Sequence, residues 1–283
     1  MKKTKIDWCD STWNPVTGCF HDCEYCYARK MATRFAGFQL EENPDDYKFR
    51  RGGTIVELDG MQARKRKDGK IVPAPYPFGF TPTLHRYKLD EPQYWKSPKN
   101  IFVCAMADLF GEWVPNDWID DVIRATQRAL QHRYLFLTKN PERYDDWLFG
   151  FEEGGISGLD VIQNCWFGAS ASNNEELERA NRSRATWISI EPIREHIDTD
   201  EDQFMEFYPT PGGEVEGKRW MWVVIGAETG NSKNKVTPKK EWIDEIVSVC
   251  DFYGTPLFMK ESLRGIMGED FRQEFPWKEG DAE

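Results

Sequence analysis

The chain has 283 residues, of which 40% are hydrophobic, 14% aromatic and 30% charged, with a formal net charge of −11. Such a composition can fill a sizeable core, and the acidic balance disfavours a protein that binds duplex DNA by overall charge. The sequence has no apolar run of roughly 18 to 20 residues and no signal peptide, so we expect no membrane partner. Seven cysteines without the spacing of a disulfide framework predict a reducing compartment, the cytoplasm.

The N-terminal third predicts one βα unit followed by an insertion. A first strand at about 14–18 precedes a helix through "EYCYARKMATRF". Residues 37–80 then contain two β-prone runs, an Asp68-Gly69 turn signal and a proline-rich exit, which predict a hairpin insertion. A second strand is predicted near "TPTLHR" at 81–86.

From residue 100 onward, short apolar runs alternate with helical patterns. Continuous rather than alternating apolar runs are typical of strands buried on both faces. The gaps between them have about the length of a crossover helix with its loops. The runs lie at 100–106, 134–138, 164–170, 186–191, 221–228 and 256–260.

Capping signals place the helices in these gaps. Asn116 is a candidate N-cap for one helix, and Ser172 with Glu175 forms a capping box for another. A further helix is expected to open at Thr237 and its following proline and to end at Gly254.

Eight strands in βα units predict an α/β fold, a complete or nearly complete (β/α)8 barrel of the TIM type, with an open doubly wound sheet as the alternative. We expect a single domain over 1–268 that carries the 37–80 hairpin insertion and a loop insertion at 206–219. An acidic tail at 269–283 is expected to fray.

The stretch "NPVTGCFHDCEYCYARK" brings together Cys19, Cys23 and Cys26. Three soft thiolates on one loop suit an iron–sulfur cluster, and suit zinc less well, because structural zinc usually has four protein ligands and no second cysteine pair exists here. His21 lies inside the loop and is the nearest fourth ligand. Unligated thiols are the remaining alternative. A four-iron cluster held by three cysteines would leave one iron for an exogenous ligand.

This cysteine spacing, with Tyr25 before the last cysteine, resembles the radical S-adenosylmethionine (SAM) superfamily. Further motifs resemble in particular a phage-associated radical SAM family without an assigned function, over nearly the whole chain. They are "KIDWCDSTWNPVTGC", "CEYCYARKMA", "TPTLHRYKLDEPQYWKSPKNIFVCAMADLFGEWVP", "FLTKNPERY", "WFGASASNNEE", "SIEPI" and "VVIGAETG".

The resemblance implies that SAM binds the open iron of a [4Fe-4S] cluster through its amino and carboxylate groups. Reductive cleavage then yields methionine and a 5′-deoxyadenosyl radical, with an electron donor such as a flavodoxin or ferredoxin as partner. The superfamily usually has a Gly-Gly-Glu segment after the second strand, which this sequence lacks. "AMAD" at 105–108 stands in its place and makes Asp108 the candidate SAM contact.

Polar residues that follow the predicted strands are further candidates, because barrel enzymes place their sites at the carboxyl ends of the strands. We assign Glu191, Glu228 and Lys260 as candidate catalytic residues. The candidate cofactor-binding residues are Asp108, Lys139, Ser170 and Asn173. Each also has a structural interpretation, as a cap, a turn residue or a member of an ion pair. Cys104 and Cys165 are expected in the core.

The substrate signal is a basic run at 63–70 on an acidic chain, which suits nucleic-acid phosphates, although a solvated hairpin tip explains it as well. Its cations are Arg64, Lys65, Arg66, Lys67 and Lys70. Trp113 and Tyr76 are candidates for base stacking. The leading hypothesis is a radical SAM enzyme that modifies a nucleobase, for example by isomerising an amino-acid-substituted thymidine in phage DNA, in the host cytoplasm if a phage encodes it. The alternatives are a modifier of a peptide or small metabolite, and a non-catalytic metal-stabilised binding protein.

Overall fold

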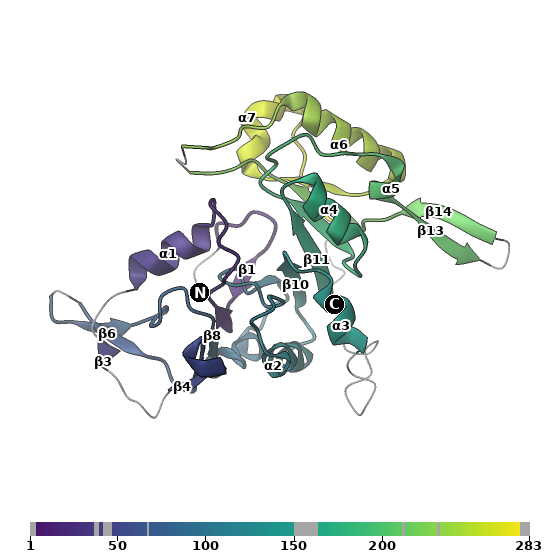
Figure 1. Ribbon diagram of the computed structural model, residues 1–283. Helices are drawn as coiled ribbons and strands as arrows, with labels where there is room; N and C mark the ends of the chain where they lie inside the picture. The colour runs from purple at the N-terminus through teal and green to yellow at the C-terminus, as the bar shows by residue number, and fades with distance from the viewer. Residues whose placement is uncertain are drawn as a thin grey trace. The chain divides into compact units, whose positions relative to one another are not determined.

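The computed structural model describes residues 4–36, 40–41, 47–66, 68–149, 164–210, 213–230 and 233–277, and the chain divides into two compact units. Within the described residues, unit 1 comprises 9–136 with 164–165, and unit 2 comprises 4–8, 137–149 and 166–277. Figure 1 labels the helices and strands of both.

The largest sheet in the described part of the chain has seven strands. Their order is β1-β9-β10-β11-β12-β15-β16, and the registered pairs, such as β12 with β15, are parallel. Six of these strands lie within the predicted apolar runs or within one residue of them, and they are buried on both faces, as a continuous apolar pattern requires. The bounds are β1 (Ser11–Trp13), β9 (Asn100–Val103), β10 (Arg133–Thr138), β11 (Cys165–Ala171), β12 (Trp187–Ile190), β15 (Trp222–Ile225) and β16 (Leu257–Met259).

The predicted (β/α)8 barrel is wrong, because the sheet begins at β1 and ends at β16 and so does not close. The strand predicted at 81–86 exists as β8 (Thr83–His85), but it pairs with β2 (Val16–Thr17) and β5 (Ile55–Leu58) in a separate sheet. Its backbone hydrogen bonds are therefore satisfied by β2 and by the insertion strand β5, and do not contribute to closure. The doubly wound alternative fails too, because the strand order follows the chain without a reversal.

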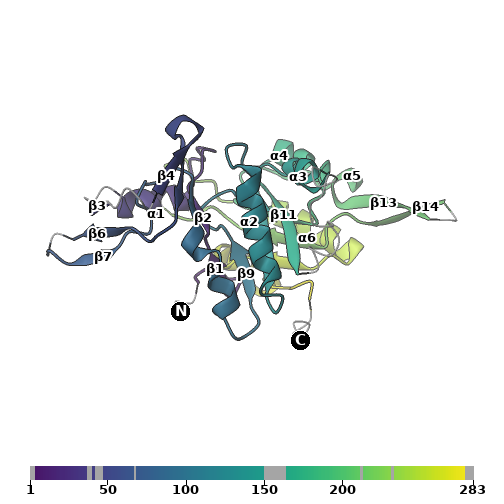
Figure 2. The same cartoon turned by 90° about the horizontal axis from the view of Figure 1, so that it is seen from below.

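The insertion supplies two small sheets to unit 1. One has the order β2-β8-β5-β4, with β4 (Tyr47–Arg50), and the other has the order β3-β6-β7, with β3 (Leu40–Glu41), β6 (Ala63–Lys65) and β7 (Ile71–Pro73). The predicted hairpin is confirmed: β6 and β7 are antiparallel, and Gly69 turns the chain with φ of 80°. The β3-β6-β7 sheet lies beside α1 (Tyr27–Phe35) in Figures 1 and 2.

The other helices of the described residues are α2 (Asn116–Gln127), α3 (Arg143–Phe149), α4 (Asn174–Asn181), α5 (Glu201–Phe204), α6 (Lys240–Tyr253) and α7 (Arg264–Met267). α2 begins at Asn116, but Pro115 is its N-cap, without a side-chain bond. α4 is capped by Asn173, one residue after the predicted position, and α6 begins at Lys240, later than predicted. Gly254 ends α6 as predicted, with φ of 63°.

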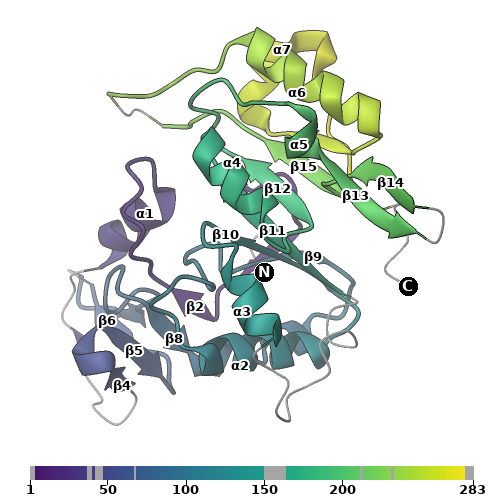
Figure 3. The ribbon, with the colours of Figure 1, turned by 45° about the vertical axis from the view of Figure 1, so that its right-hand side comes forward.

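The 206–219 insertion of unit 2 is a hairpin of β13 (Met205–Thr210) and β14 (Gly213–Lys218), which are antiparallel. Figure 3 shows this hairpin projecting beside α5. None of the helices in the described ranges has both the length and the apolar character that a membrane span requires.

The core of unit 2 is built from aromatic rings, and the chain after α7 completes it. Trp222 packs against Trp187, and its indole N–H donates to the carbonyl of Glu274 at 2.9 Å. The amide of Glu274 donates in turn to the carbonyl of Leu257 in β16. Residues 269–277 therefore do not fray as predicted, whereas 278–283 lie outside the described residues.

Trp277→Ala should lower the free energy of unfolding by about 2 kcal/mol, because the half-buried ring packs against other aromatic rings. Its neighbours are Trp166, Trp222 and Phe275, with ring centroids between 5.2 and 5.4 Å away. Denaturant unfolding measures the loss. The control is Phe252→Ala, which removes a ring that is 78% exposed and should cost less than about 0.5 kcal/mol. Equal losses in both variants would contradict this packing.

Candidate functional site

The cysteine loop, residues 18–26, connects β2 to α1 in unit 1. It begins at Gly18, whose φ of 88° suits glycine and whose amide donates to the carbonyl of Met106 at 2.9 Å. A β-carbon at this position would overlap the backbone carbonyl of Thr81. The loop therefore starts between two other backbone segments, with room only for glycine.

All three cysteines of the loop are half-buried and free of disulfides. The backbone N–H of His21 donates to Sγ of Cys19 at 3.5 Å, and the Cys23 thiol donates to the carbonyl of His21 at 3.9 Å. Cys26 is the N-cap of α1, and its Sγ accepts from the backbone N–H of Arg29 at 3.3 Å. The thiols are thus oriented by local backbone groups and by the start of a helix.

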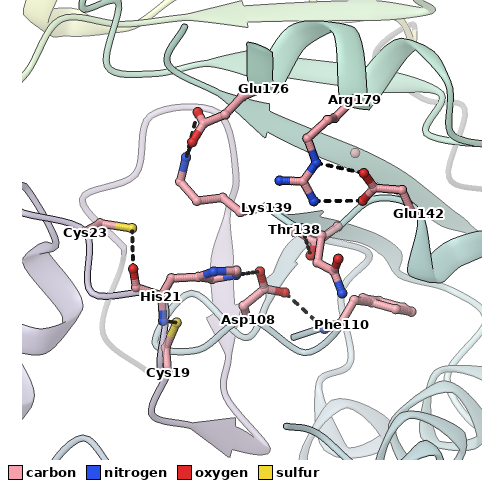
Figure 4. A network of polar contacts seen from close by, with 12 residues as sticks. Cys19, His21, Cys23, Asp108, Phe110, Thr138, Lys139, Glu142, Glu176 and Arg179 are labelled. Atoms are coloured by element: carbon pink, nitrogen blue, oxygen red, sulfur yellow. Dashed lines mark hydrogen bonds and ion pairs between the residues drawn. The ribbon is translucent and has the colours of Figure 1, made fainter. Parts of the chain in front are cut away.

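The side chain of His21 contacts Asp108, which follows β9. Its Nε2 lies 2.7 Å from Oδ2 of Asp108, and because a carboxylate oxygen accepts, the imidazole donates (Figure 4). Oδ1 of Asp108 accepts from the backbone N–H of Phe110 at 3.0 Å. Asp108 is only 5% exposed, and both of its oxygens bond groups of the chain.

Burial dominates the electrostatics of the loop. It raises the pKa of the Cys19 thiol to about 12; the amide of His21 opposes this shift, whereas Asp108 adds to it. The thiol is therefore neutral at pH 7 until a metal displaces its proton, as metal coordination does. The start of α1 at Cys26 would favour the negative charge that metal-bound thiolates carry.

The chemistry of the donor set, three cysteine thiols on one loop, suits an iron–sulfur cluster. Within the part of the chain that the structure describes, no three His, Cys, Asp or Glu side chains are grouped so as to hold one metal ion. The three thiols are outside any disulfide, and two of the sulfurs accept from backbone N–H groups, as ligand sulfurs of such clusters commonly do. Cys19, Cys23 and Cys26 are the residues that would hold the cluster.

In unit 2, the carboxyl ends of three neighbouring strands place Glu191, Gly226 and Lys260 in one row. Nζ of Lys260 donates to Oε1 of Glu191 at 2.5 Å. A β-carbon on Gly226 would lie 3.1 Å from side-chain carbons of both residues, so the glycine allows them to meet across the intervening strand. Two of the three candidate catalytic residues thus form an ion pair.

Glu228, the third candidate catalytic residue, follows β15 and is 5% exposed. Within the described residues, its Oε2 has no hydrogen-bond partner. A buried carboxylate oxygen without a donor is unfavourable, so this group could accept a hydrogen bond from a bound molecule.

Two of the candidate cofactor-binding residues of unit 2, Lys139 and Asn173, serve the start of α4. Nζ of Lys139 binds both carboxylate oxygens of Glu176 at 3.0 Å (Figure 4). Oε2 of Glu176 also accepts from the amide and hydroxyl of Ser172, and Asn173 caps the helix. Burial alone would raise the pKa of Glu176, but Lys139 and Ser172 outweigh it and hold that pKa below its ordinary value. Ser170 is half-buried within β11, level with Ser189 of β12.

The sequence predicts, as an alternative, an ion pair of Lys260 with Glu191 or Glu228, and the pair with Glu191 is confirmed. It does not predict the contact between His21 and Asp108. The sequence indicates His21 only as a metal ligand, because its partner Asp108 lies 87 residues away, beyond any local pattern. The sequence predicts base stacking for Trp113, but its ring packs edge-on against His21 and Phe20, with centroids 4.9 and 5.3 Å away. A histidine between two cysteines and an aspartate after a predicted strand were the available signals.

A family model described as "Protein of unknown function (DUF5131)" matches residues 3–269. No curated protein matches the chain, and no solved structure matches it.

Gly18→Ala should destabilise the protein by about 3 kcal/mol, because it combines left-handed backbone with overlap against Thr81. Denaturant unfolding of metal-free protein gives the value. The matched control is Gly69→Ala, which has a similar φ of 80° but no atom within 4 Å of the added carbon, and should cost about 1 kcal/mol. If the two variants lose the same stability, the close approach at Gly18 is not real.

Proposed function

We propose that this chain, which belongs to the DUF5131 family, is a radical SAM enzyme that binds a [4Fe-4S] cluster through Cys19, Cys23 and Cys26. One observation carries the proposal. Three half-buried thiols outside any disulfide lie on one short loop between a strand and a helix, and two of their sulfurs accept hydrogen bonds from backbone N–H groups. A thiolate set of three leaves one iron of a four-iron cluster for SAM.

When bound, the cluster would pass one electron to SAM, whose C5′–S bond breaks to give methionine and a 5′-deoxyadenosyl radical. The chain's own task is to hold the three thiolates and to orient the loop. Arg29 on the first turn of α1 supports this, since its guanidinium donates to the carbonyl of Cys19 at 3.4 Å and lies over the ring of Phe80 at 5.0 Å. An electron donor such as a flavodoxin or ferredoxin, and a cytoplasmic location, complete the proposal.

For the substrate we propose a nucleobase, in the form of an amino-acid-substituted thymidine whose side chain is isomerised. The β6–β7 hairpin supports contact with nucleic-acid phosphates. Its described cations are partly or fully exposed, although Arg66 pairs with Asp68 at 3.5 Å. They are Arg64, Lys65, Arg66 and Lys70; Lys67 lies outside the described residues. Lys30 and Arg34 are exposed on the neighbouring α1.

The strand ends of unit 2 carry charges complementary to those of an amino acid. Lys260 offers a cation for a carboxylate, and Glu191 offers an anion for an ammonium group. Glu228 adds a buried carboxylate oxygen that has no partner among the described residues. This set could bind both charged ends of an amino acid.

Each of Cys19→Ala, Cys23→Ala and Cys26→Ala should abolish SAM cleavage and reduce bound iron well below that of the wild type. The measurement is anaerobic reconstitution with iron and sulfide, followed by iron content, the reduced electron paramagnetic resonance spectrum with and without SAM, and 5′-deoxyadenosine yield. The control is Cys9→Ala, a half-buried cysteine outside the loop that should retain all three signals. Stoichiometric zinc with no iron signal would favour the non-catalytic alternative and overturn the proposal.

Removing positive charge from the β6–β7 hairpin should weaken the binding of a DNA substrate. Lys65→Glu with Lys70→Glu is expected to raise the KM for modified phage DNA at least tenfold and to flatten its salt dependence. Mass spectrometry of digested nucleosides follows the reaction. 5′-Deoxyadenosine formation without substrate should not change and serves as the internal control. If KM is unaffected, or if only a peptide or small metabolite is converted, the nucleic-acid assignment is wrong.

A further inference from the structure

We propose that Asp108 and His21 form a clamp that fixes the cysteine loop, so that both are positioning residues for the cluster thiolates. The inference rests on the proposed function and concerns unit 1 alone. It gives Asp108 a role through His21, in place of the direct SAM contact expected from the sequence.

The clamp begins on the 104–113 segment, which follows β9 and runs beside the loop. Asp108 is buried on this segment and bonds the amide of Phe110, which fixes the direction of its carboxylate. The remaining oxygen binds Nε2 of His21 at 2.7 Å, a short, charge-assisted hydrogen bond.

Trp113 of the same segment supports the imidazole from a second direction. Its ring meets His21 edge-on at 4.9 Å between centroids and also contacts Phe20. Gly111 makes this position possible, because a β-carbon there would overlap the indole of Trp113. The imidazole is therefore held by a carboxylate and by an aromatic ring.

The main chain of His21 connects the clamp to the sulfurs. Its N–H donates to Sγ of Cys19 and its carbonyl accepts from the Cys23 thiol (Figure 4). A fixed side chain at His21 thus fixes a peptide unit on each side of it. On cluster binding, the thiol donor of Cys23 is lost, but the N–H directed at Cys19 remains, and hydrogen bonds to ligand sulfur tune cluster potentials.

The first test uses the full chain without metal, so that it does not depend on a cluster. Alkylation by iodoacetamide is followed by mass spectrometry at each cysteine. His21→Ala should speed alkylation of Cys19 and Cys23 about tenfold, the size expected for loss of a charge-assisted hydrogen bond. Cys26, held by the first turn of α1, should change less, and buried Cys250 should stay slow if the variant remains folded.

The matched variants separate positioning from simple charge. His21→Gln places an N–H donor near the position of Nε2 and should restore most of the protection, whereas Asp108→Asn should reproduce the loss. Combining Asp108→Asn with His21→Ala should add little, because both remove one interaction. The control is Glu112→Gln, which removes an exposed carboxylate from the same segment and should leave alkylation unchanged.

The second test uses the reconstituted protein. His21→Ala keeps the backbone N–H of residue 21 but no longer fixes the peptide unit that carries it. The weakened N–H···S bond should stabilise the reduced cluster less, so the cluster midpoint potential should fall and iron loss to a chelator should be faster. His21→Gln should reverse both effects. Unchanged alkylation, potential and iron loss in His21→Ala would overturn the clamp. If the wild-type protein takes up no cluster, but the variants differ from it in alkylation as predicted, the proposed function is refuted and the clamp is supported.

Discussion

The contact between the cysteine loop and the 104–113 segment is the constraint on which the candidate site depends. Residues of this segment bond the chain before, within and after the loop. The amide of Met106 donates to Oδ1 of Asn14 at 3.1 Å, the carbonyl of Met106 accepts from the amide of Gly18, and the carbonyl of Ala105 accepts from the hydroxyl of Tyr27 at 2.5 Å. The segment itself turns at Cys104, a buried residue with φ of 57°, a conformation that costs about 1–2 kcal/mol outside glycine. After this turn, Met106 and Asp108 contact the loop.

Local sequence patterns predicted the strands but not their partners. The apolar runs at 134–138 and 256–260 became buried strands because each has too little polarity for any other position. Closure was not predictable, because β8 could pair either with the main sheet or with the insertion, and short strands carry no signal for the choice. The α4 cap shifted from Ser172 to Asn173 because both residues can cap, and the backbone geometry decides.

In the candidate site, too, the sequence predicted the residues better than the contacts between them. Thiolate spacing identified Cys19, Cys23 and Cys26, since all three lie on one loop, and strand-end polarity identified Glu191 and Lys260. Their pairing depends on Gly226 of the intervening strand, which leaves room for the two side chains to meet. Sequence reasoning names chemical groups well, but tertiary contacts determine which of them meet.

Residues 269–277 follow α7 and run along β16 as a strip, and this strip has a consequence for solubility. Its Arg272 carbonyl accepts from Met259 and its Glu274 amide donates to Leu257, so backbone groups at the last strand of the open sheet bond within the same chain. An uncovered parallel edge is a template on which strands of another molecule can add. Since the sheet does not close on itself, this strip does part of what barrel closure would do: it withdraws one edge from intermolecular pairing and opposes aggregation.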